Sequence, residues 1–331
     1  SKNGLPRKPL TKRRLKNLIL NVLKNPFNMV VLVSLVILFC LIIIPLLTMI
    51  ANTFTLAQGE LRRVQGHVGD FTLYYWKYIL ASTLSGAVLW GPLKNSFICG
   101  LFTVLVSVPL GSVLAWLMIR TDIPGKKILG LLVTVPYMIP SWTKALAWLA
   151  MFRNSTSGAD GFLAGMGIPI PDWLAYGPIA IVLCMSMHYY AFSYIMVSGA
   201  LRSINSELEE MGEIQGASKA QILRHITLPL ILPSVLSATV MTISKSIGTY
   251  GVPANLGNRI GYYTLATKMR NFIDQGPQAV GYAMSIVLVL LAALIIFSNQ
   301  RIVGVRKSYA TVSGKGGRAT LMPLGKAKKP L

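Results

Sequence analysis

One polar segment, residues 203–234, holds the residues whose types and spacing most suggest a built site. Four of the ten acidic residues of the chain lie in it, namely Glu207, Glu209, Glu210 and Glu213. Ser206 is followed three residues later by Glu209, and Ser218 by Gln221, which is the spacing of a capping box. The segment is therefore predicted to form two short helices, over residues 207–215 and 219–227.

The two short helices are predicted to meet at a sharp corner. Gly216 lies where the C-terminus of a helix favours a residue with positive φ, and Pro229 is expected to end the second helix. Gly216 and Ala217 carry little side-chain bulk. A corner of this kind could dock into a groove on another protein.

A second set of candidate residues lies in otherwise apolar stretches. Lys144, Lys245, His188 and Tyr189, with the neighbouring Tyr190, are ionisable or polar. A charged side chain near the centre of a membrane helix costs about 2.5–3.5 kcal/mol, so such residues are functional candidates by default. If the lysines face a solute pathway, they favour an anion or an anionic metal chelate. The alternative for Lys245 is that it snorkels to the outer surface.

The composition explains why these stretches are read as membrane spans. Of the 331 residues, 53% are hydrophobic and only 13% are charged, with a formal net charge of +22 and a mean hydropathy of +0.58. Soluble domains carry about 25% charged residues, and disordered basic proteins are poor in apolar residues. These percentages exclude both classes. The charged and the apolar residues also occupy different parts of the chain, which is typical of a membrane protein.

Six apolar stretches are long enough to cross a bilayer, which takes about 20 residues in a helix. They are residues 27–51, 95–119, 128–152, 177–200, 230–252 and 275–300. Pro136, Pro140 and Lys144 interrupt the third, and the fifth must continue past Lys245 to reach the required length. The stretches do not alternate in polarity, so they predict helices and not barrel strands. The fold class predicted is an all-α membrane protein with six transmembrane helices.

The distribution of basic residues predicts the orientation in the membrane. Twenty-two of the 32 basic residues fall on the side that holds both termini and residues 203–234. The positive-inside rule places this side, with both termini, in the cytoplasm. Residues 1–26 are predicted to form a basic amphipathic segment on an anionic lipid surface, a reading preferred to nucleic-acid binding. Residues 27–302 form the membrane domain, and residues 303–331 a basic cytoplasmic tail.

No catalytic, cofactor-binding or metal-binding residues are predicted. The chain has no G-x-x-x-x-G-K-[ST] phosphate loop, and the glycines around Lys315 follow no strand. Its three histidines lie far apart. Cys40, Cys99 and Cys184 fall within apolar stretches and are expected to be small packing residues.

Within residues 203–234 the sequence resembles the signature of binding-protein-dependent ABC importer permeases. That signature is Glu-Ala-Ala, three residues, Gly, nine residues, then Ile-x-Leu-Pro. This chain has Glu210-Met211-Gly212, three residues, Gly216, nine residues, then Ile226-Thr227-Leu228-Pro229. The spacing matches throughout, and the departure is Met-Gly in place of the two alanines.

Other stretches are similar to the iron, polyamine and thiamine branch of this family. They are residues 135–148 (VPYMIPSWTKALAW), 246–257 (SIGTYGVPANLG) and 262–269 (YYTLATKM). Residues 308–330 look like the linker between the halves of fused ferric-iron-type permeases. The resemblance implies a type I importer fold and an expectation that the chain is a half-sized relative or an N-terminal portion of a longer protein.

The resemblance also implies how the chain works. The corner becomes a coupling helix that seats in a cleft of a dimeric ABC ATPase, which binds ATP and Mg, while this chain itself is not an enzyme. Glu210 is expected to contact the ATPase or to brace the corner. The coupling residues are Glu210, Gly216, Ala217, Ser218, Ile226, Leu228 and Pro229, and the pathway candidates are Lys144, His188, Tyr189 and Lys245. Further expected partners are a second permease half, a soluble binding protein and membrane lipids, in the bacterial inner membrane.

Three alternatives stay open from the sequence. The favoured substrate is ferric iron or an anionic chelate or phosphonate, and a polyamine or thiamine importer is the alternative within the family. A secondary transporter would need intramembrane carboxylates for ion coupling, and no acid lies in the six stretches. A membrane-embedded enzyme would need a nucleophile with a base or a metal cluster, neither of which the sequence predicts.

Overall fold

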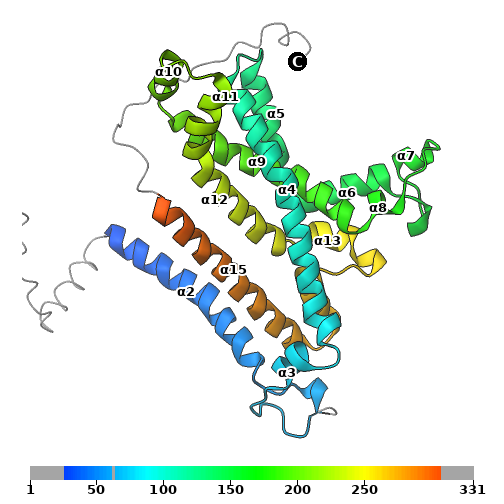
Figure 1. Ribbon diagram of the computed structural model, residues 1–331. Coiled ribbons are helices and arrows are strands. Elements are labelled where there is room, and N and C mark those ends of the chain that lie inside the picture. The colour runs from blue at the N-terminus through cyan, green and yellow to red at the C-terminus, as the bar shows by residue number, and fades with distance from the viewer. Residues whose placement is uncertain (1–25, 62–63, 307–331) are drawn as a thin grey trace, which may run out of the picture. The chain divides into compact units, whose positions relative to one another are not determined.

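The computed structural model describes residues 26–61 and 64–306 (Figure 1). These residues form helices and no β-strand, apart from an isolated antiparallel bridge between Thr55 and Phe71. The chain divides into two compact units with the boundary after Leu73, and each unit is described by itself. The predicted N-terminal segment and most of the predicted basic tail lie outside the described residues.

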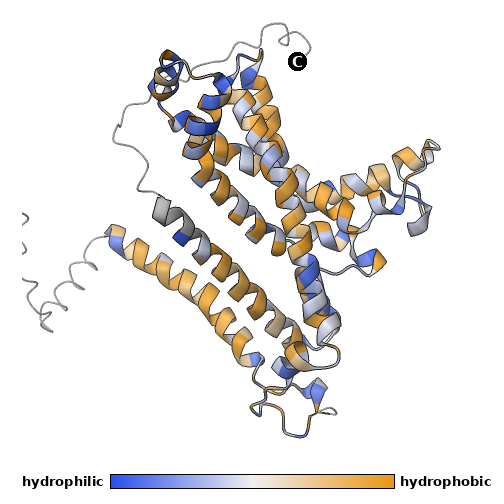
Figure 2. Cartoon of the chain, in the orientation of Figure 1, coloured by the Kyte–Doolittle hydropathy of each residue, from blue (hydrophilic) through white to orange (hydrophobic). Residues whose placement is uncertain are grey.

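The first unit consists of one long apolar helix and a folded loop. Helix α2 (Pro26–Asn52) covers the first predicted span, and its residues are predominantly hydrophobic (Figure 2). After η1 (Gln58–Glu60), the chain returns toward the end of α2. The loop is closed by Leu56, whose N–H donates to the Asp70 carbonyl at 2.9 Å and whose side chain is buried.

The second unit contains the remaining helices. In chain order they are α3 (Tyr74–Ala81), η2 (Gly86–Trp90), α4 (Gly91–Arg120), α5 (Lys126–Met138), α6 (Ser141–Phe152), η3 (Ser155–Ser157), α7 (Phe162–Gly165), α8 (Asp172–Ala175), α9 (Gly177–Ser203), α10 (Ser206–Ile214), α11 (Lys219–Ile222), η4 (Leu223–Thr227), α12 (Leu228–Ile247), α13 (Gly251–Leu256), η5 (Asn258–Ile260), α14 (Leu265–Gln275) and α15 (Gln278–Arg306).

Five described helical stretches are long and apolar enough to cross a membrane. They are Pro26–Asn52, Gly86–Arg120, Gly177–Ser203, Lys219–Ile247 and Gln278–Ser298. They correspond to the first, second, fourth, fifth and sixth predicted spans, so the all-α membrane fold class is confirmed. The third predicted span, residues 128–152, stays a prediction as a crossing segment, because these residues do not form one continuous helix.

The predicted third span is broken into two shorter helices. Helix α5 has 13 residues and α6 has 12, so neither is long enough to cross alone. The break falls at Ile139, which has φ −79° and ψ 130° ahead of Pro140. A residue before proline is driven out of the helical region by its clash with the proline ring. Pro136, by contrast, is contained within α5.

The predicted fifth span was misplaced at both ends. It was expected to reach its length by continuing past Lys245 toward Val252, but α12 ends at Ile247. The length comes from the other end, because the helical stretch begins at Lys219. The prediction placed the start of this span too late, because the first turns after Lys219 carry charged and polar side chains.

Helices α4 and α9 approach closely because small residues line their contact. A Cβ atom on Gly111 of α4 would lie only 2.4 Å from the Tyr190 carbonyl oxygen of α9. Ser186 of α9 donates from its hydroxyl to the Thr103 carbonyl of α4 at 3.5 Å. Small and hydroxyl residues are the common means of packing helices inside a membrane. Helices α5 and α12 pack on the same α9, and α12 also contacts α4 and α15.

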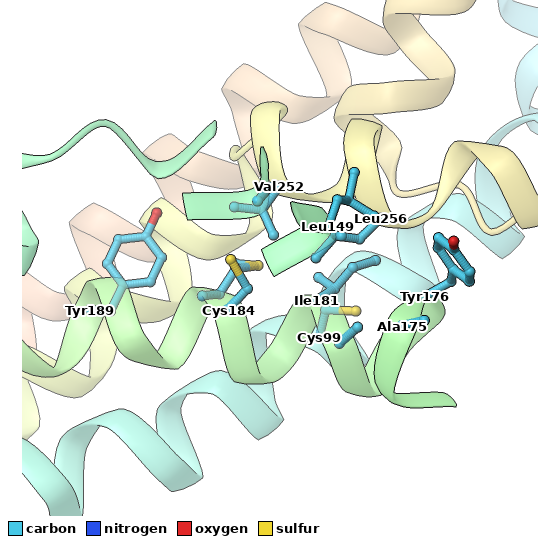
Figure 3. Packing of buried hydrophobic residues seen from close by; sticks show 12 residues of the cluster. Cys99, Leu149, Ala175, Tyr176, Ile181, Cys184, Tyr189, Val252 and Leu256 are labelled. Atoms are coloured by element: carbon cyan, nitrogen blue, oxygen red, sulfur yellow. The ribbon is translucent and has the colours of Figure 1, made fainter. Parts of the chain in front are cut away.

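A buried cluster joins α9 to α6 and α13 (Figure 3). Ile181 and Cys184 of α9 pack there with Leu149 of α6 and with Val252 of α13. Cys99 and Cys184 are only 2% and 1% exposed, which confirms that they are packing residues, whereas Cys40 of α2 is exposed, contrary to the same expectation. This cluster holds α6, the second part of the broken segment, against α9.

Candidate functional site

The corner predicted from residues 203–234 is present and lies between α9 and α12 (Figure 1). Its first helix, α10, is capped by Asn205, whose side-chain oxygen accepts from the Glu207 N–H at 3.3 Å. The predicted capping box of Ser206 with Glu209 is therefore wrong. Glu209 does not turn back to the helix start, because its carboxylate is engaged by Arg120 and Thr227.

The turn after α10 requires glycine, as predicted. Gly216 has φ +83°, a left-handed conformation that L side chains rarely adopt. The N–H of Ala217 donates to the Gly212 carbonyl at 3.0 Å, and the N–H of Gly216 to the Glu213 carbonyl at 2.9 Å. This pair of bonds is a Schellman motif, which closes the last turn of a helix and sends the chain in a new direction.

The second helix of the corner begins at the predicted capping box. Ser218 accepts from the Gln221 N–H at 3.3 Å, and the Gln221 side chain accepts from the Ser218 N–H at 2.8 Å. The prediction that Pro229 ends this helix is wrong. One π-helical turn, η4, follows α11, and the chain then continues directly into α12. The wider turn accommodates the proline ring, which would clash with a carbonyl of an ordinary α-helical turn.

The two arms of the corner pack tightly on each other at Gly212. A Cβ atom there would lie 3.2 Å from side-chain atoms of both Ile222 and Ile226. The departure from the family signature at this position thus has a structural role, because glycine lets α10 approach the isoleucines of α11 and η4. The predicted coupling residue Ile226 is half-buried in this contact.

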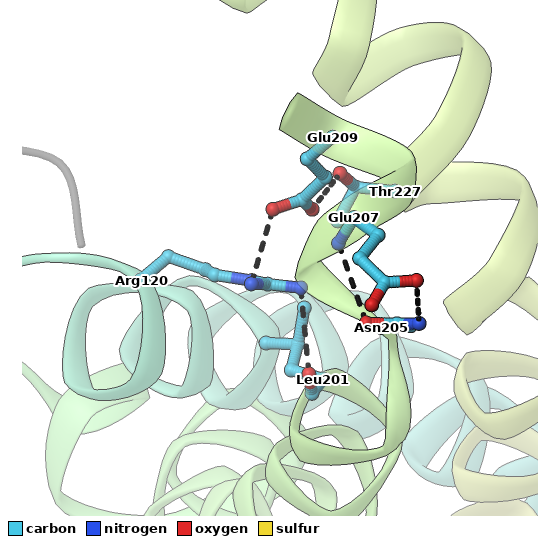
Figure 4. A network of polar contacts seen from close by, with 6 residues as sticks. All are labelled: Arg120, Leu201, Asn205, Glu207, Glu209 and Thr227. Carbon is cyan, nitrogen blue, oxygen red and sulfur yellow. Dashed lines mark hydrogen bonds and ion pairs between the residues drawn. The ribbon is translucent and has the colours of Figure 1, made fainter. Parts of the chain in front are cut away.

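A buried polar network joins the corner to the long helices (Figure 4). Arg120 Nη1 lies 3.1 Å from Glu209 Oε2, and their side chains are 3% and 11% exposed. The Thr227 hydroxyl donates to Glu209 Oε1 at 2.8 Å. Arg120 Nη2 also donates to the Leu201 carbonyl at 3.4 Å. The Glu209 carboxylate therefore connects α10 with α4 and η4, and Arg120 adds the end of α9.

Glu209 links the two arms of the corner, through its contacts with Arg120 and Thr227. From the sequence, Glu210 was the candidate for this role or for a contact with the ATPase. Glu210 is exposed, as are Ser218, Leu228 and Pro229, and Ala217 is half-buried. Met211 and Ile214, which sequence analysis did not select, are 56% and 86% exposed. The corner thus presents apolar side chains beside carboxylates, and the coupling roles of the predicted residues stay a prediction.

Of the predicted pathway residues, the structure brings Lys144 and His188 into contact. Lys144 of α6 reaches back across the break, and its ammonium donates to the carbonyls of Pro136 and, at 3.3 Å, of Ile139. Its Nζ also lies 2.5 Å from His188 Nδ1 on α9. Carbonyls freed at a helix end need donors, above all where water is scarce. Lys144 supplies them, which gives its half-buried charge a structural role as well.

Aromatic rings lie between Lys144 and Lys245. Tyr137 stacks on His188, with ring centroids 5.3 Å apart, and lies 5.9 Å from Phe192, one turn further along α9. Lys245 Nζ lies 5.4 Å from the centre of the Phe192 ring. Tyr137 and Phe192 were missed by sequence analysis, because aromatic residues are common in apolar stretches and nothing marks them out.

Tyr189 belongs to the buried cluster of Figure 3, and its ring meets the His188 ring edge-on, with ring centroids 5.0 Å apart. It is 5% exposed and its hydroxyl lies 3.2 Å from the Thr249 hydroxyl. Arg120 was also missed as a site residue, because at the end of an apolar stretch it has the appearance of an orientation anchor. The pathway roles of Lys144, His188, Tyr189 and Lys245 stay predictions.

Residues 107–308 match the family described as the inner membrane component of binding-protein-dependent transport systems. A probable sulfate transport system permease of Marchantia polymorpha is 28% identical over 180 residues, which cover 53% of this chain and 59% of that protein. A putative 2-aminoethylphosphonate transport system permease of Salmonella typhimurium is 30% identical over 166 residues, covering 48% of this chain and 62% of that protein. The match thus spans about three fifths of these two relatives.

Solved structures show the same fold. A chain of a bacterial ABC transporter involved in import of the acidic polysaccharide alginate superposes with a TM-score of 0.64 and 18% identity, covering 88% of this chain and 99% of that one. A chain of an inward-facing methionine ABC transporter gives a TM-score of 0.50 and 22% identity, covering 68% and 98%. The two relatives named above are called sulfate and phosphonate permeases, so they do not support the iron, polyamine and thiamine branch specifically.

Proposed function

This chain belongs to the family of inner membrane components of binding-protein-dependent transport systems, and we propose on that basis that it is the permease subunit of an ATP-driven importer. In this proposal its helices form the solute pathway across the bacterial inner membrane, and the corner of α10 and α11 binds a cytoplasmic ATPase. The observation that carries the proposal is the buried ion pair of Arg120 with Glu209, because it ties the corner to a membrane-length helix.

The exposed face of the corner is suited to bind a protein groove. Met211 and Ile214 offer apolar surface, and Glu210 stands beside them as a charged contact. Apolar residues at the centre of an interface with charge at its rim are the usual arrangement of a protein contact. The positive-inside charge distribution supports a cytoplasmic position for this face.

Movement of the corner would be transmitted through packed and paired groups. Gly212 seats α10 on α11 and η4, and the helix continues without interruption into α12. The ion pair with Arg120 adds α4 to the elements that must follow. Closure of the ATPase would thus tilt α12 and α4 together, which would expose the pathway alternately to each side of the membrane.

The proposed substrate class is a small oxyanion such as sulfate or a phosphonate. Lys144 and Lys245 bring positive charge to both ends of the aromatic group of Tyr137, His188 and Phe192. Two relatives carry the names of sulfate and 2-aminoethylphosphonate permeases. Both observations favour an anion over a polyamine or thiamine, which are cations, and they favour it over ferric iron, the substrate first expected.

The proposal requires partners. An ABC ATPase dimer would bind ATP and Mg, and a second permease half, identical or different, would complete the pathway. A soluble binding protein would deliver the solute on the opposite side of the membrane. This chain itself would bind no cofactor and catalyse no reaction.

Uptake into proteoliposomes tests the proposal. The chain is reconstituted with its second permease half, its ATPase and its binding protein. Radiolabelled sulfate uptake is measured with ATP or ADP, with 2-aminoethylphosphonate and spermidine as competitors. We expect uptake only with ATP, and competition by the phosphonate alone. Uptake driven by an ion gradient without ATP would contradict the proposal in favour of a secondary transporter, and competition by spermidine would contradict the substrate class.

A further inference from the structure

A cavity of about 690 Å³ lies between the end of α4, the start of α5 and the last turns of α9. Its lining includes three cations, Lys126, Lys127 and Arg202, together with Ser198 and Tyr194. It lies at the same end of the unit as the corner, because α9 leads directly into α10 there. The site of Lys144 and its aromatic neighbours shares no lining residue with it.

The cations of this cavity lack acidic partners among the described residues. No ion pair there reaches Lys126, Lys127 or Arg202, whereas the nearby Arg120 is paired with Glu209. Lys127 and Arg202 are exposed and Lys126 is half-buried. Three unpaired cations around one cavity, two on α5 and one on α9, repel each other, so an anion bound among them would be stabilised by all three.

The N-terminus of α5, which lines the cavity, adds to the positive charge of the three cations. Lys126 and Lys127 occupy the first turn of α5, which has no acidic residue and whose N-cap, Gly125, has no side chain to cap it. Cations are unfavourable at a helix N-terminus, where the dipole and the free N–H groups favour an anion. The arrangement is therefore poorly balanced unless an anionic group lies against it.

A buried hydroxyl in the same lining also lacks a partner. The Ser198 side-chain oxygen finds no hydrogen-bond partner among the described residues, although Ser198 is only 5% exposed. A buried polar atom without a partner is costly, which suggests that something else supplies the bond. Ser198 lies one turn before Arg202 on α9, so one ligand could reach both.

The remaining lining is apolar except for Thr134. Leu131 and Ile195 line the cavity and are 67% and 47% exposed. From Arg202 to Tyr194 the cavity follows α9 for about 12 Å, since an α-helix rises 1.5 Å per residue. The cavity therefore has a cationic end toward the membrane surface and an apolar wall below it. A small hydrophilic anion would gain nothing from that wall.

We propose that this cavity binds the phosphate head group of an anionic phospholipid, with the start of an acyl chain along Leu131 and Ile195. The phosphate lies among Lys126, Lys127 and Arg202 near the N-terminus of α5, and Ser198 donates to an oxygen of the lipid. Lipid bound here packs against α9 directly beside the corner.

Native mass spectrometry of the delipidated permease–ATPase complex tests the proposal. The probes are dioleoyl phosphatidylglycerol, dioleoyl phosphatidylcholine, inorganic phosphate and sulfate. The charge variant is Lys126→Gln with Arg202→Gln, and its matched control is Lys94→Gln with Arg301→Gln, two exposed basic residues outside both the cavity and the corner. A third variant, Gly199→Leu, fills the cavity and keeps its charge, because a Cβ atom at Gly199 meets nothing within 4 Å.

We expect retention of phosphatidylglycerol over phosphatidylcholine, and an affinity about 25-fold weaker in the charge variant, since each basic residue contributes about fivefold to anionic-lipid binding. Gly199→Leu should also lose the lipid, and the control should keep it. Equal loss in the control, equal retention of phosphatidylcholine, or displacement of the lipid by phosphate or sulfate would overturn the proposal. If the charge variant does not fold, Gly199→Leu decides alone.

Discussion

Glu209 in the short helix α10 and Arg120 at the end of α4 form an ion pair of 3.1 Å in which both side chains are almost fully buried. The carboxylate also accepts from the Thr227 hydroxyl of η4. One buried group thus joins the two arms of the corner to a helix that begins far earlier in the chain. A push on the corner cannot leave α4 in place without separating these charges.

Glu209→Gln should destabilise the chain by about 3–5 kcal/mol, because it leaves the Arg120 charge buried without its counter-ion. Glu210→Gln should change stability by no more than about 0.5 kcal/mol, since Glu210 is exposed. Thermal unfolding of both variants in detergent measures the difference. Replacing Arg120 and Glu209 together by Leu should recover most of the loss, and a loss that does not recover would show that the pair is not the cause.

Gly216→Val should destabilise the corner by about 1–2 kcal/mol, because a β-branched residue opposes the φ of +83° found there. The cost is conformational and not steric, since a Cβ atom would meet nothing within 4 Å. Gly216→Asn is the matched variant, because asparagine tolerates this conformation. Proteolysis of the corner should be faster for the valine variant alone, and equal rates would contradict the argument.

Gly111→Ala should weaken the packing of α4 on α9, because its Cβ atom would lie 2.4 Å from the Tyr190 carbonyl oxygen. Overpacking of this kind costs about 1–3 kcal/mol. The control is Gly199→Ala on α9, which enters open space. A lower unfolding temperature is expected for the first variant only, and similar temperatures for the two would show that the helices can separate without cost.

Lys144→Met should cost about 1–3 kcal/mol, because it removes the donor for the Pro136 and Ile139 carbonyls at the break between α5 and α6. Lys245→Met should leave stability nearly unchanged, since Lys245 is exposed and contacts only the Phe192 ring among the groups described. Both variants are expected to lose sulfate uptake. Full uptake by a well-folded Lys245→Met protein would mean that Lys245 gives no support for an anionic substrate.

The apolar helices and the corner could be predicted from the sequence because local chemistry decides them. Long apolar runs predicted six spans, of which the described residues contain five as membrane-length helices. The spacing of Ser218, Gln221 and Gly216 predicted a cap and a turn that the structure contains. Pro140 marked the break in the third stretch, since proline restricts its own backbone and that of the residue before it.

The contacts between distant residues could not be predicted in this way. Nothing near Glu209 in the sequence indicates that it pairs with Arg120, and its neighbour Glu210 has the same local chemistry. Pro229 was expected to end a helix because a proline ring clashes with the preceding α-helical turn. The turn that precedes it, η4, is π-helical and therefore wider. Tyr137 and Phe192 became site candidates only when packing placed them between Lys144 and Lys245.

The most direct test of the account is ATP hydrolysis stimulated by the substrate-loaded binding protein in reconstituted complexes carrying Ile214→Asp. Ile214 is 86% exposed at the corner, so the change should leave folding and membrane insertion intact. Stimulation should be lost in this variant, while Glu207→Gln, an exposed change on the same helix, should retain it. Full stimulation by a normally inserted Ile214→Asp protein would contradict the claim that this corner couples the permease to its ATPase.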